Sequence, residues 1–144
     1  MIAPRMTDRY VLEIGKEVKL TFKPLSSAQK AEGMVYIGME SGNVLEDRIQ
    51  MLSKILKFSL TKVEGIQYYD GDDFDLTFDD NGQAEQTCID ELCNIQHFDK
   101  LIFASFNLIT GIKERLYNPF TLENVEGAKF ILPKKKASPK KQKA

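Results

Sequence analysis

Two hydrophobic periods follow each other along the first sixty residues, and they restrict what this chain can fold into. From Tyr10 to Phe22 apolar residues alternate with polar ones. This period of two predicts strands over 9–14 and 17–23. Gly15-Lys16 lies between them and can supply a two-residue turn with glycine at its first position. The chain therefore opens with a β-hairpin.

A helical period replaces the alternation after Pro24. Ser26 and Gln29 have the spacing of a capping box, which predicts a helix over about 27–39. The clearest helical segment follows it, with apolar residues on one face and charged residues on the other. The apolar positions of that face are Val44, Leu45, Ile49, Leu52, Ile55 and Leu56.

A second, smaller hairpin is expected in the middle of the chain. Residues 60–69 read as extended, and residues 73–78 as a short strand paired back on 63–69. The run Asp70-Gly71-Asp72-Asp73 supplies the turn. A second turn at 79–82 precedes a helix expected over 83–95. Asp79 or Asp80, the first residues of this turn, can cap the helix.

A last helix is expected from Leu101 to Ile109, and it is apolar on most sides. It is either central to the core or an exposed interaction surface, and both interpretations stay open. Residues 120–132 carry only a weak pattern. The fold class predicted from these elements is α+β, with helices around the second hairpin and further helices toward the C-terminus.

The composition changes at Pro133, where a lysine-rich tail begins. The tail has no acidic residue, and Lys, Pro, Ser, Ala and Gln are typical of disordered segments. Its lysines are Lys134, Lys135, Lys136, Lys140, Lys141 and Lys143. We therefore expect a flexible N-terminus over 1–8, one domain over 9–132 and a disordered tail over 133–144.

Charge divides between this tail and the rest of the chain. Without the six tail lysines, 14 basic residues oppose 21 acidic residues, which leaves a net charge near −7. Such a body repels the phosphate backbone of nucleic acids, so only the tail could contact one. No apolar run is long enough to span a membrane, and no secretory signal is evident. The expected location is the cytoplasm, with no membrane partner.

No motif for catalysis or metal binding is found. The acids of 70–80 do not fit a calcium loop, because Asp75 stands at the sixth position where glycine is required. Cys88 and Cys93 are five residues apart with one histidine, His97, nearby, and they are interpreted as small apolar residues on a helix. We expect no catalytic residue, no metal and no cofactor, and a protein that is not an enzyme.

Several short segments together resemble one protein family. They are the segment Phe22-Lys23-Pro24-Leu25-Ser26, the hairpin Val63-Glu64-Gly65-Ile66 with Asp70-Gly71, the strand Leu76-Thr77-Phe78 and the helix with Asp90-Glu91-Leu92. Over roughly residues 10–112 the chain resembles the tail assembly chaperones of long-tailed bacteriophages. That resemblance implies a small protein of the host cytoplasm without catalytic activity.

The resemblance also implies partners. Such chaperones bind the long helical tape-measure protein and help tail-tube subunits polymerise around it, so both are expected partners, and a homo-oligomer is also considered. The residues expected to contact a protein partner through apolar helical surface are Leu101, Phe103, Phe106, Ile109, Leu52 and Ile55. Two alternatives are a structural virion component, such as a connector or baseplate piece, and a nucleic-acid-associated regulator that acts through its lysine tail.

Overall fold

The computed structural model describes residues 5–38, 44–95, 101 and 128–131 of the chain. Its elements are β1 (Tyr10–Ile14), β2 (Val18–Phe22), α1 (Ser27–Gly38), α2 (Val44–Ser59), β3 (Leu60–Glu64), α3 (Gln86–Cys93) and β4 (Ala128–Ile131). Strands and helices share one core, so the fold is α+β, as the change of hydrophobic period predicts.

The strands of the described residues form one antiparallel sheet with the order β3-β2-β1-β4. β1 and β2 form the predicted hairpin, and their register pairs Ile14 with Val18. This register leaves residues 15–17 in the turn, so the turn has three residues where the sequence predicts two. Strands β3 and β4, which are distant in sequence, flank this hairpin.

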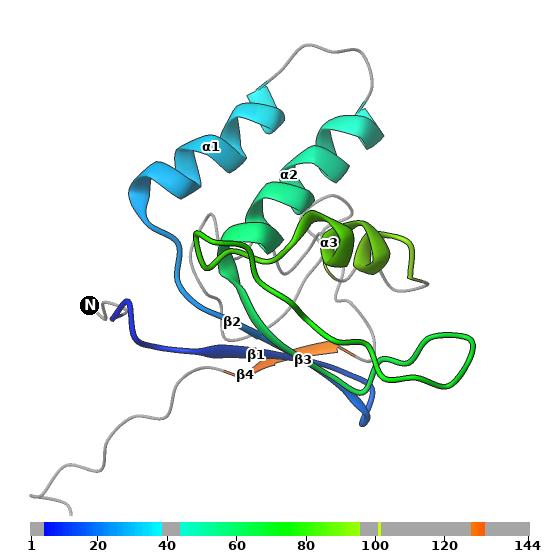
Figure 1. The fold of residues 1–144 in the computed structure, drawn as a ribbon. Helices are drawn as coiled ribbons and strands as arrows, with labels where there is room; N and C mark the ends of the chain where they lie inside the picture. Colours follow the sequence, from blue (N-terminus) through cyan, green and yellow to red (C-terminus); the bar gives the residue numbers. More distant parts are fainter. Residues whose placement is uncertain (1–4, 39–43, 96–100, 102–127, 132–144) are drawn as a thin grey trace, which may run out of the picture.

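One face of the sheet is covered by the helices. Figure 1 shows α1, α2 and α3 on the same side of the strands. The alternation in β1 and β2 places every second side chain on this side, where it is removed from water. The largest fully buried side chains come from both layers: Leu12, Leu20, Phe22, Met51, Leu52, Ile55, Leu56, Leu60, Ile89, Leu92 and Leu101.

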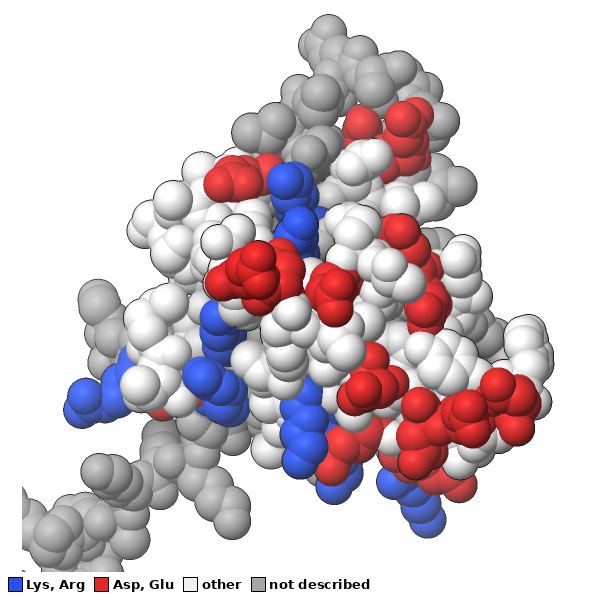
Figure 2. All heavy atoms as spheres, in the orientation of Figure 1, with Lys and Arg blue, Asp and Glu red and all other residues white. Residues whose placement is uncertain are grey.

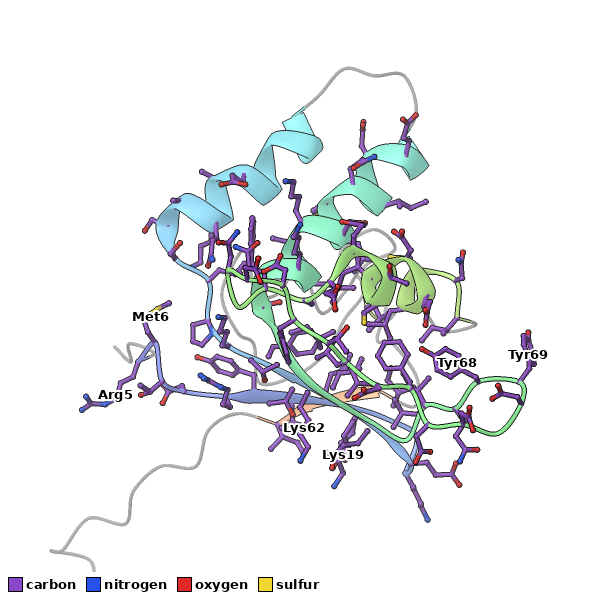
Figure 3. All side chains as sticks on the ribbon, viewed as in Figure 1. Arg5, Met6, Lys19, Lys62, Tyr68 and Tyr69 are labelled. Atoms are coloured by element: carbon purple, nitrogen blue, oxygen red, sulfur yellow. The ribbon has the colours of Figure 1, made fainter. Side chains whose placement is uncertain are left out.

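The opposite face of the sheet is largely polar, and Val11 with its strand partner Ile131 is a half-buried apolar pair on it. Lys19 and Lys62 project from the strands on the side away from the helices (Figure 3). Lys19 pairs with Glu13 across β1 and β2 at 3.9 Å, and Lys62 pairs with Glu64 along β3 at 3.4 Å. An antiparallel sheet commonly keeps one face in water. Exposed ion pairs of this kind stabilise a fold little, so the core face holds the sheet in place.

The predicted capping box of α1 is present. The backbone N–H of Gln29 donates to Ser26 Oγ at 3.1 Å, and the backbone N–H of Ser26 donates to Gln29 Oε1 at 3.0 Å. The two residues thus satisfy each other's backbone donors at the helix start. The observed helix, Ser27–Gly38, agrees with the predicted range of about 27–39.

Helix α2 follows the predicted pattern and extends it to Ser59. Leu52, Ile55 and Leu56 are fully buried, as are the side chain of Met51 and that of Leu60, which begins β3 directly after the helix. The backbone passes from helix to strand without an intervening loop. This tight junction fixes β3 against the C-terminal end of α2.

The second hairpin differs from its prediction. β3 pairs with β2, and residues 73–78 do not form a strand. Only an isolated bridge joins Gln67 to Asp73, supported by a backbone hydrogen bond of 2.8 Å from Phe74 N–H to Ile66 O. The prediction that 73–78 pairs with 63–69 was therefore wrong as a ladder. β3 pairs instead with β2, whose Leu20 and Phe22 are fully buried in the core, and the return segment keeps only the bridge and the turn contacts.

Two further corrections concern α3 and the C-terminal region. The helix begins at Gln86 and not near residue 83, and its N-cap, Glu85, makes no side-chain cap hydrogen bond. Asp79 instead binds the backbone of its own turn. β4, which pairs with β1, lies in the region 120–132 that the sequence pattern left unassigned.

Other predictions lie outside the described residues. They are the apolar helix beyond Leu101, His97 and the lysine tail 133–144. The domain limits at 8/9 and 132/133 also stay predictions.

Within the N-terminal segment, Arg5 and Asp8 close a turn through two hydrogen bonds, of 2.8 and 2.9 Å.

Candidate protein-binding surface

The structure places the predicted partner-binding residues in two groups. Leu52, Ile55 and Leu101 are fully buried in the core. Phe103, Phe106 and Ile109 lie outside the described residues. Side chains without exposed surface are not accessible to a partner in this conformation, so Leu52, Ile55 and Leu101 serve the core here. Their contact with a partner stays an untested prediction.

The cysteines are packed into the body of the protein. Cys88 is buried on α3, where its Sγ lies 3.4 Å from Thr77 Oγ1 and 3.6 Å from the carbonyl oxygen of Asp75. Burial raises the pKa of the half-buried Cys93 thiol, which keeps it protonated near neutral pH. Both are free thiols, and within the described ranges no group of His, Cys, Asp and Glu is arranged to hold a metal.

The segment that joins β3 to α3 has the most distinctive surface. We call residues 65–85 the acidic aromatic loop. It contains seven acidic residues and no Lys, Arg or His; the acids are Asp70, Asp72, Asp73, Asp75, Asp79, Asp80 and Glu85. It also contains three of the four large hydrophobic side chains that are exposed in the described chain, Tyr68, Tyr69 and Phe78.

The tip of this loop is fixed by local hydrogen bonds. The backbone N–H of Tyr68 donates to Asp72 O at 2.8 Å, and the N–H of Gly71 donates to Tyr68 O at 3.0 Å. Asp70 Oδ1 accepts the N–H of Asp72 at 2.9 Å. This is the chemistry expected of an Asp-Gly turn. A turn was predicted at 70–73, and the observed turn closes between Tyr68 and Asp72, one to two residues earlier. These local bonds stabilise the conformation of the tip without help from a partner.

A second turn shapes the other end of the loop. Asp79 Oδ1 accepts the backbone N–H groups of Asn81 at 2.9 Å and of Gln83 at 3.1 Å. The N–H of Ala84 then donates to Lys57 O at 3.2 Å, and Ala84 is buried. Phe78, next to this turn, is 45% exposed. The turn therefore attaches the loop to the end of α2 while leaving an aromatic ring partly in water.

Tyr68 connects the tip of the loop to α3. Its hydroxyl donates to Glu91 Oε2, and its ring lies 5.9 Å from the buried ring of Phe74 at an interplanar angle of 43°. Tilted aromatic pairs at this separation are favourable. The pKa of Tyr68 is raised to about 12. The hydrogen bond to Glu91 is the largest cause, followed by burial and by nearby negative charge. Tyr68 is thus a hydrogen-bond donor over the whole physiological pH range.

Tyr69 has the opposite environment. Its relative exposure is 113%, the largest of any exposed hydrophobic side chain in the described residues. Figure 3 shows it pointing away from the protein at the tip of the loop, while Tyr68 lies nearer α3. A tyrosine that is wholly in water contributes no burial to the fold. Its ring is free to contact another molecule.

Negative charge surrounds these aromatic side chains. Figure 2 shows acidic side chains gathered over the part of this face where Figure 1 places the loop between β3 and α3. Asp70, Asp72, Asp73 and Asp75 are all exposed. The ion pairs formed within the described ranges lie on the outer face of the sheet, so these four carboxylates are not neutralised by them.

Sequence reasoning recognised the acidic turns but not the surface. It interpreted Phe74, Leu76 and Phe78 as one half-buried strand, whereas Phe74 is buried, Leu76 is partly buried and Phe78 is exposed. The available signal was the pair Tyr68-Tyr69 directly before an Asp-Gly turn, in a stretch without any basic residue. Neighbouring side chains of an extended segment point to opposite sides, so one of two adjacent aromatic residues there is expected to face water.

Comparison with protein-family models, with curated proteins and with solved structures gives no match for this chain. Within the part of the chain that the structure describes, no helix has the length and apolar character needed to cross a membrane.

Proposed function

We propose that this protein is a non-catalytic binding protein whose contact surface is the acidic aromatic loop, and that it acts as a chaperone or adaptor in phage tail assembly. The observation that supports binding most directly is Tyr69, an aromatic side chain fully in water on a loop fixed by hydrogen bonds. Tyr69 is one of three large aromatic side chains exposed in this loop, and exposed apolar side chains that gather in one segment are typical of interaction sites.

The form of the loop also supports this proposal. Tyrosine is enriched in interfaces because its ring offers large contact area with few rotatable bonds. A loop held by its own backbone bonds loses little conformational entropy on binding. The tail-assembly role itself rests on the sequence resemblance, with the tape-measure and tail-tube proteins as proposed partners in the host cytoplasm.

Affinity capture tests the proposed function. The tagged full chain is expressed in the host during infection, and captured proteins are identified by mass spectrometry. Recovery of a very long helical protein or of tail-tube subunits supports the chaperone role. The matched variant Tyr69→Ala should recover less of them at equal protein concentration, because it removes only the exposed ring.

Two further measurements, on purified particles and on nucleic acid captured with the protein, separate the alternatives. A structural virion component would be present in purified particles, where an assembly chaperone is absent. A regulator acting through the lysine tail would recover nucleic acid, and replacing the six tail lysines with glutamine would abolish that recovery. Either result would overturn the chaperone proposal.

A further inference from the structure

From the exposed aromatic side chains and their charge we infer the kind of partner that the acidic aromatic loop binds. The loop takes a segment of a partner protein that is rich in lysine or arginine, with a cationic side chain seated against Tyr69. This inference rests on the proposed function and adds the chemistry of the partner to it. The occupant is specified by charge complementarity between the two surfaces.

An exposed aromatic side chain could contact an apolar partner, but the charged residues around Tyr69 disfavour one. Four exposed aspartates follow Tyr69 within six positions of the sequence: Asp70, Asp72, Asp73 and Asp75. An apolar helix laid on this tip would remove some of these carboxylates from water without a compensating partner, which is costly. A basic segment supplies that compensation.

A cation also has a favourable site on the aromatic ring itself. Lysine and arginine side chains are attracted to the face of a tyrosine, and their alkyl stems can cover its apolar surface. The described loop from Gly65 to Glu85 holds no basic side chain that could occupy this site from within. Tyr68 does not compete for the role, because its hydroxyl is committed to Glu91 and its ring to Phe74.

The same charges argue against other classes of ligand. Nucleic acids and anionic membrane surfaces carry phosphate groups, which the seven acids of the loop repel. A metal ion is not favoured either, since these carboxylates do not converge into a ligand group within the described residues. A basic protein segment is the class that satisfies both the rings and the charges.

Peptide titration tests the inference with the full-length protein. Two fluorescein-labelled probes of equal length are compared, one repeating Lys-Ala-Ala and the other Gln-Ala-Ala, and binding is followed by fluorescence anisotropy at low salt. We expect the lysine probe to bind roughly tenfold more tightly, and to weaken as salt is added, because exposed charges are screened.

Variants locate the binding. Tyr69→Ala should weaken the lysine probe roughly 2- to 5-fold, the size of an exposed cation–π contact, while Tyr69→Phe retains the ring and should bind like the parent protein. The double variant Asp72→Asn/Asp73→Asn should weaken it further. Asparagine at position 73 still has a side-chain oxygen that can accept the 3.3 Å hydrogen bond from Gln67, so this contact within the loop is kept. Glu32→Gln/Glu46→Gln removes two exposed charges from the helices and serves as the matched control.

Three results would overturn the inference. They are equal binding of the two probes, equal loss in the control and loop double variants, and binding of the lysine probe only after the tail lysines are replaced by glutamine. The last result would show that the chain's own tail occupies the surface. If affinity capture recovers a partner that the aspartate variants bind normally, the proposed function stands and this inference fails. If no partner is recovered at all, the proposed function fails instead.

Discussion

Two tyrosines that are adjacent in the sequence have different tasks in the structure. Tyr68 attaches the loop to α3 through its hydroxyl, which donates to Glu91, and its ring packs on Phe74 of the same loop. Tyr69, the next residue, points into water. The contacts of the first residue therefore determine where the second is presented, and the two can be tested separately.

The first prediction concerns the ionisation of Tyr68. Its hydrogen bond to Glu91 stabilises the neutral phenol, so the folded pKa of about 12 exceeds the ordinary value of 10.0. The stabilisation from this bond is therefore complete below pH 10 and is lost as the pH rises through about 12. An ultraviolet titration of tyrosinate, taken as the difference between the parent protein and Tyr68→Phe, should show this late midpoint.

The control for that titration is Glu91→Ala, which removes the acceptor. The pKa of Tyr68 should then fall toward 10.0, since the first cause of its shift is gone. A Tyr68 midpoint that stays near 12 in Glu91→Ala would show that the hydrogen bond is not the cause.

The second prediction concerns Gly65, at the end of β3. Its φ is +84°, and a Cβ added there would lie 2.0 Å from the carbonyl oxygen of Glu17 in the β1–β2 turn. Gly65→Ala should lower the free energy of unfolding by about 2–4 kcal/mol, through backbone strain and displacement of that turn. Urea denaturation followed by circular dichroism measures the change.

Gly71 offers a matched control for this substitution. Its φ is +93°, but an added Cβ would have nothing within 4 Å. Gly71→Ala should therefore cost only the backbone term, about 1 kcal/mol. Equal costs at the two positions would show that the close approach of Gly65 to Glu17 does not matter.

At the scale of elements, α1 and α3 begin in different ways. α1 begins with the reciprocal Ser26 and Gln29 bonds, whereas α3 begins at Gln86 after an N-cap without a side-chain bond. Asp79, which could have capped α3, closes the turn before it. The acid that looks available in the sequence is thus used to shape the acidic aromatic loop.

The third prediction concerns the capping box of α1. Ser26→Ala should lower the free energy of unfolding by about 1 kcal/mol, because the N–H of Gln29 loses its acceptor. The neighbouring exposed Ser27 is the first residue of the helix and offers a control. Ser27→Ala should change the free energy of unfolding little, because the cap is supplied by Ser26 and the substitution leaves the Ser26 and Gln29 bonds in place. Thermal or urea unfolding of the two variants measures the difference, and equal effects would contradict the cap assignment.

The sequence allowed the local elements to be predicted but not all of their partners. Alternation defined β1 and β2, the capping box defined α1, and helical spacing defined α2, since each signal is contained within a few residues. β4 was missed because four residues, Ala128 to Ile131, carry too short a pattern, and their partner β1 lies more than a hundred positions earlier. The pairing of β3 with β2 is likewise decided by the assembled core.

At the scale of the whole molecule, the two faces of the sheet have separate roles. The helices cover one face and form the core with it, while the other face carries charged side chains, among them Glu13, Lys19 and Lys62. The acidic aromatic loop extends from the sheet between β3 and α3 (Figure 1). The exposed large aromatic side chains of the described chain are therefore confined to this loop, which makes it the surface to test for binding.

The same distribution explains how far the candidate site could be predicted. The sequence directed attention to long apolar helices, and the described members of that set, Leu52, Ile55 and Leu101, proved to be core. Hydrophobicity identifies what a chain buries more readily than what it exposes. Whether an aromatic residue such as Tyr69 faces water depends on the turn and on Tyr68 beside it, which only the folded structure shows.

The central claim is that a partner protein contacts the acidic aromatic loop at Tyr69, and photo-crosslinking tests it most directly. The photoreactive residue benzoylphenylalanine is placed at position 69 in one full-length protein and at position 19, on the outer sheet face, in another. Irradiation of cells that express the protein together with its partners should link position 69 to another protein and leave position 19 unlinked. Crosslinks from position 19 with none from position 69 would contradict the account and move the binding surface to the sheet.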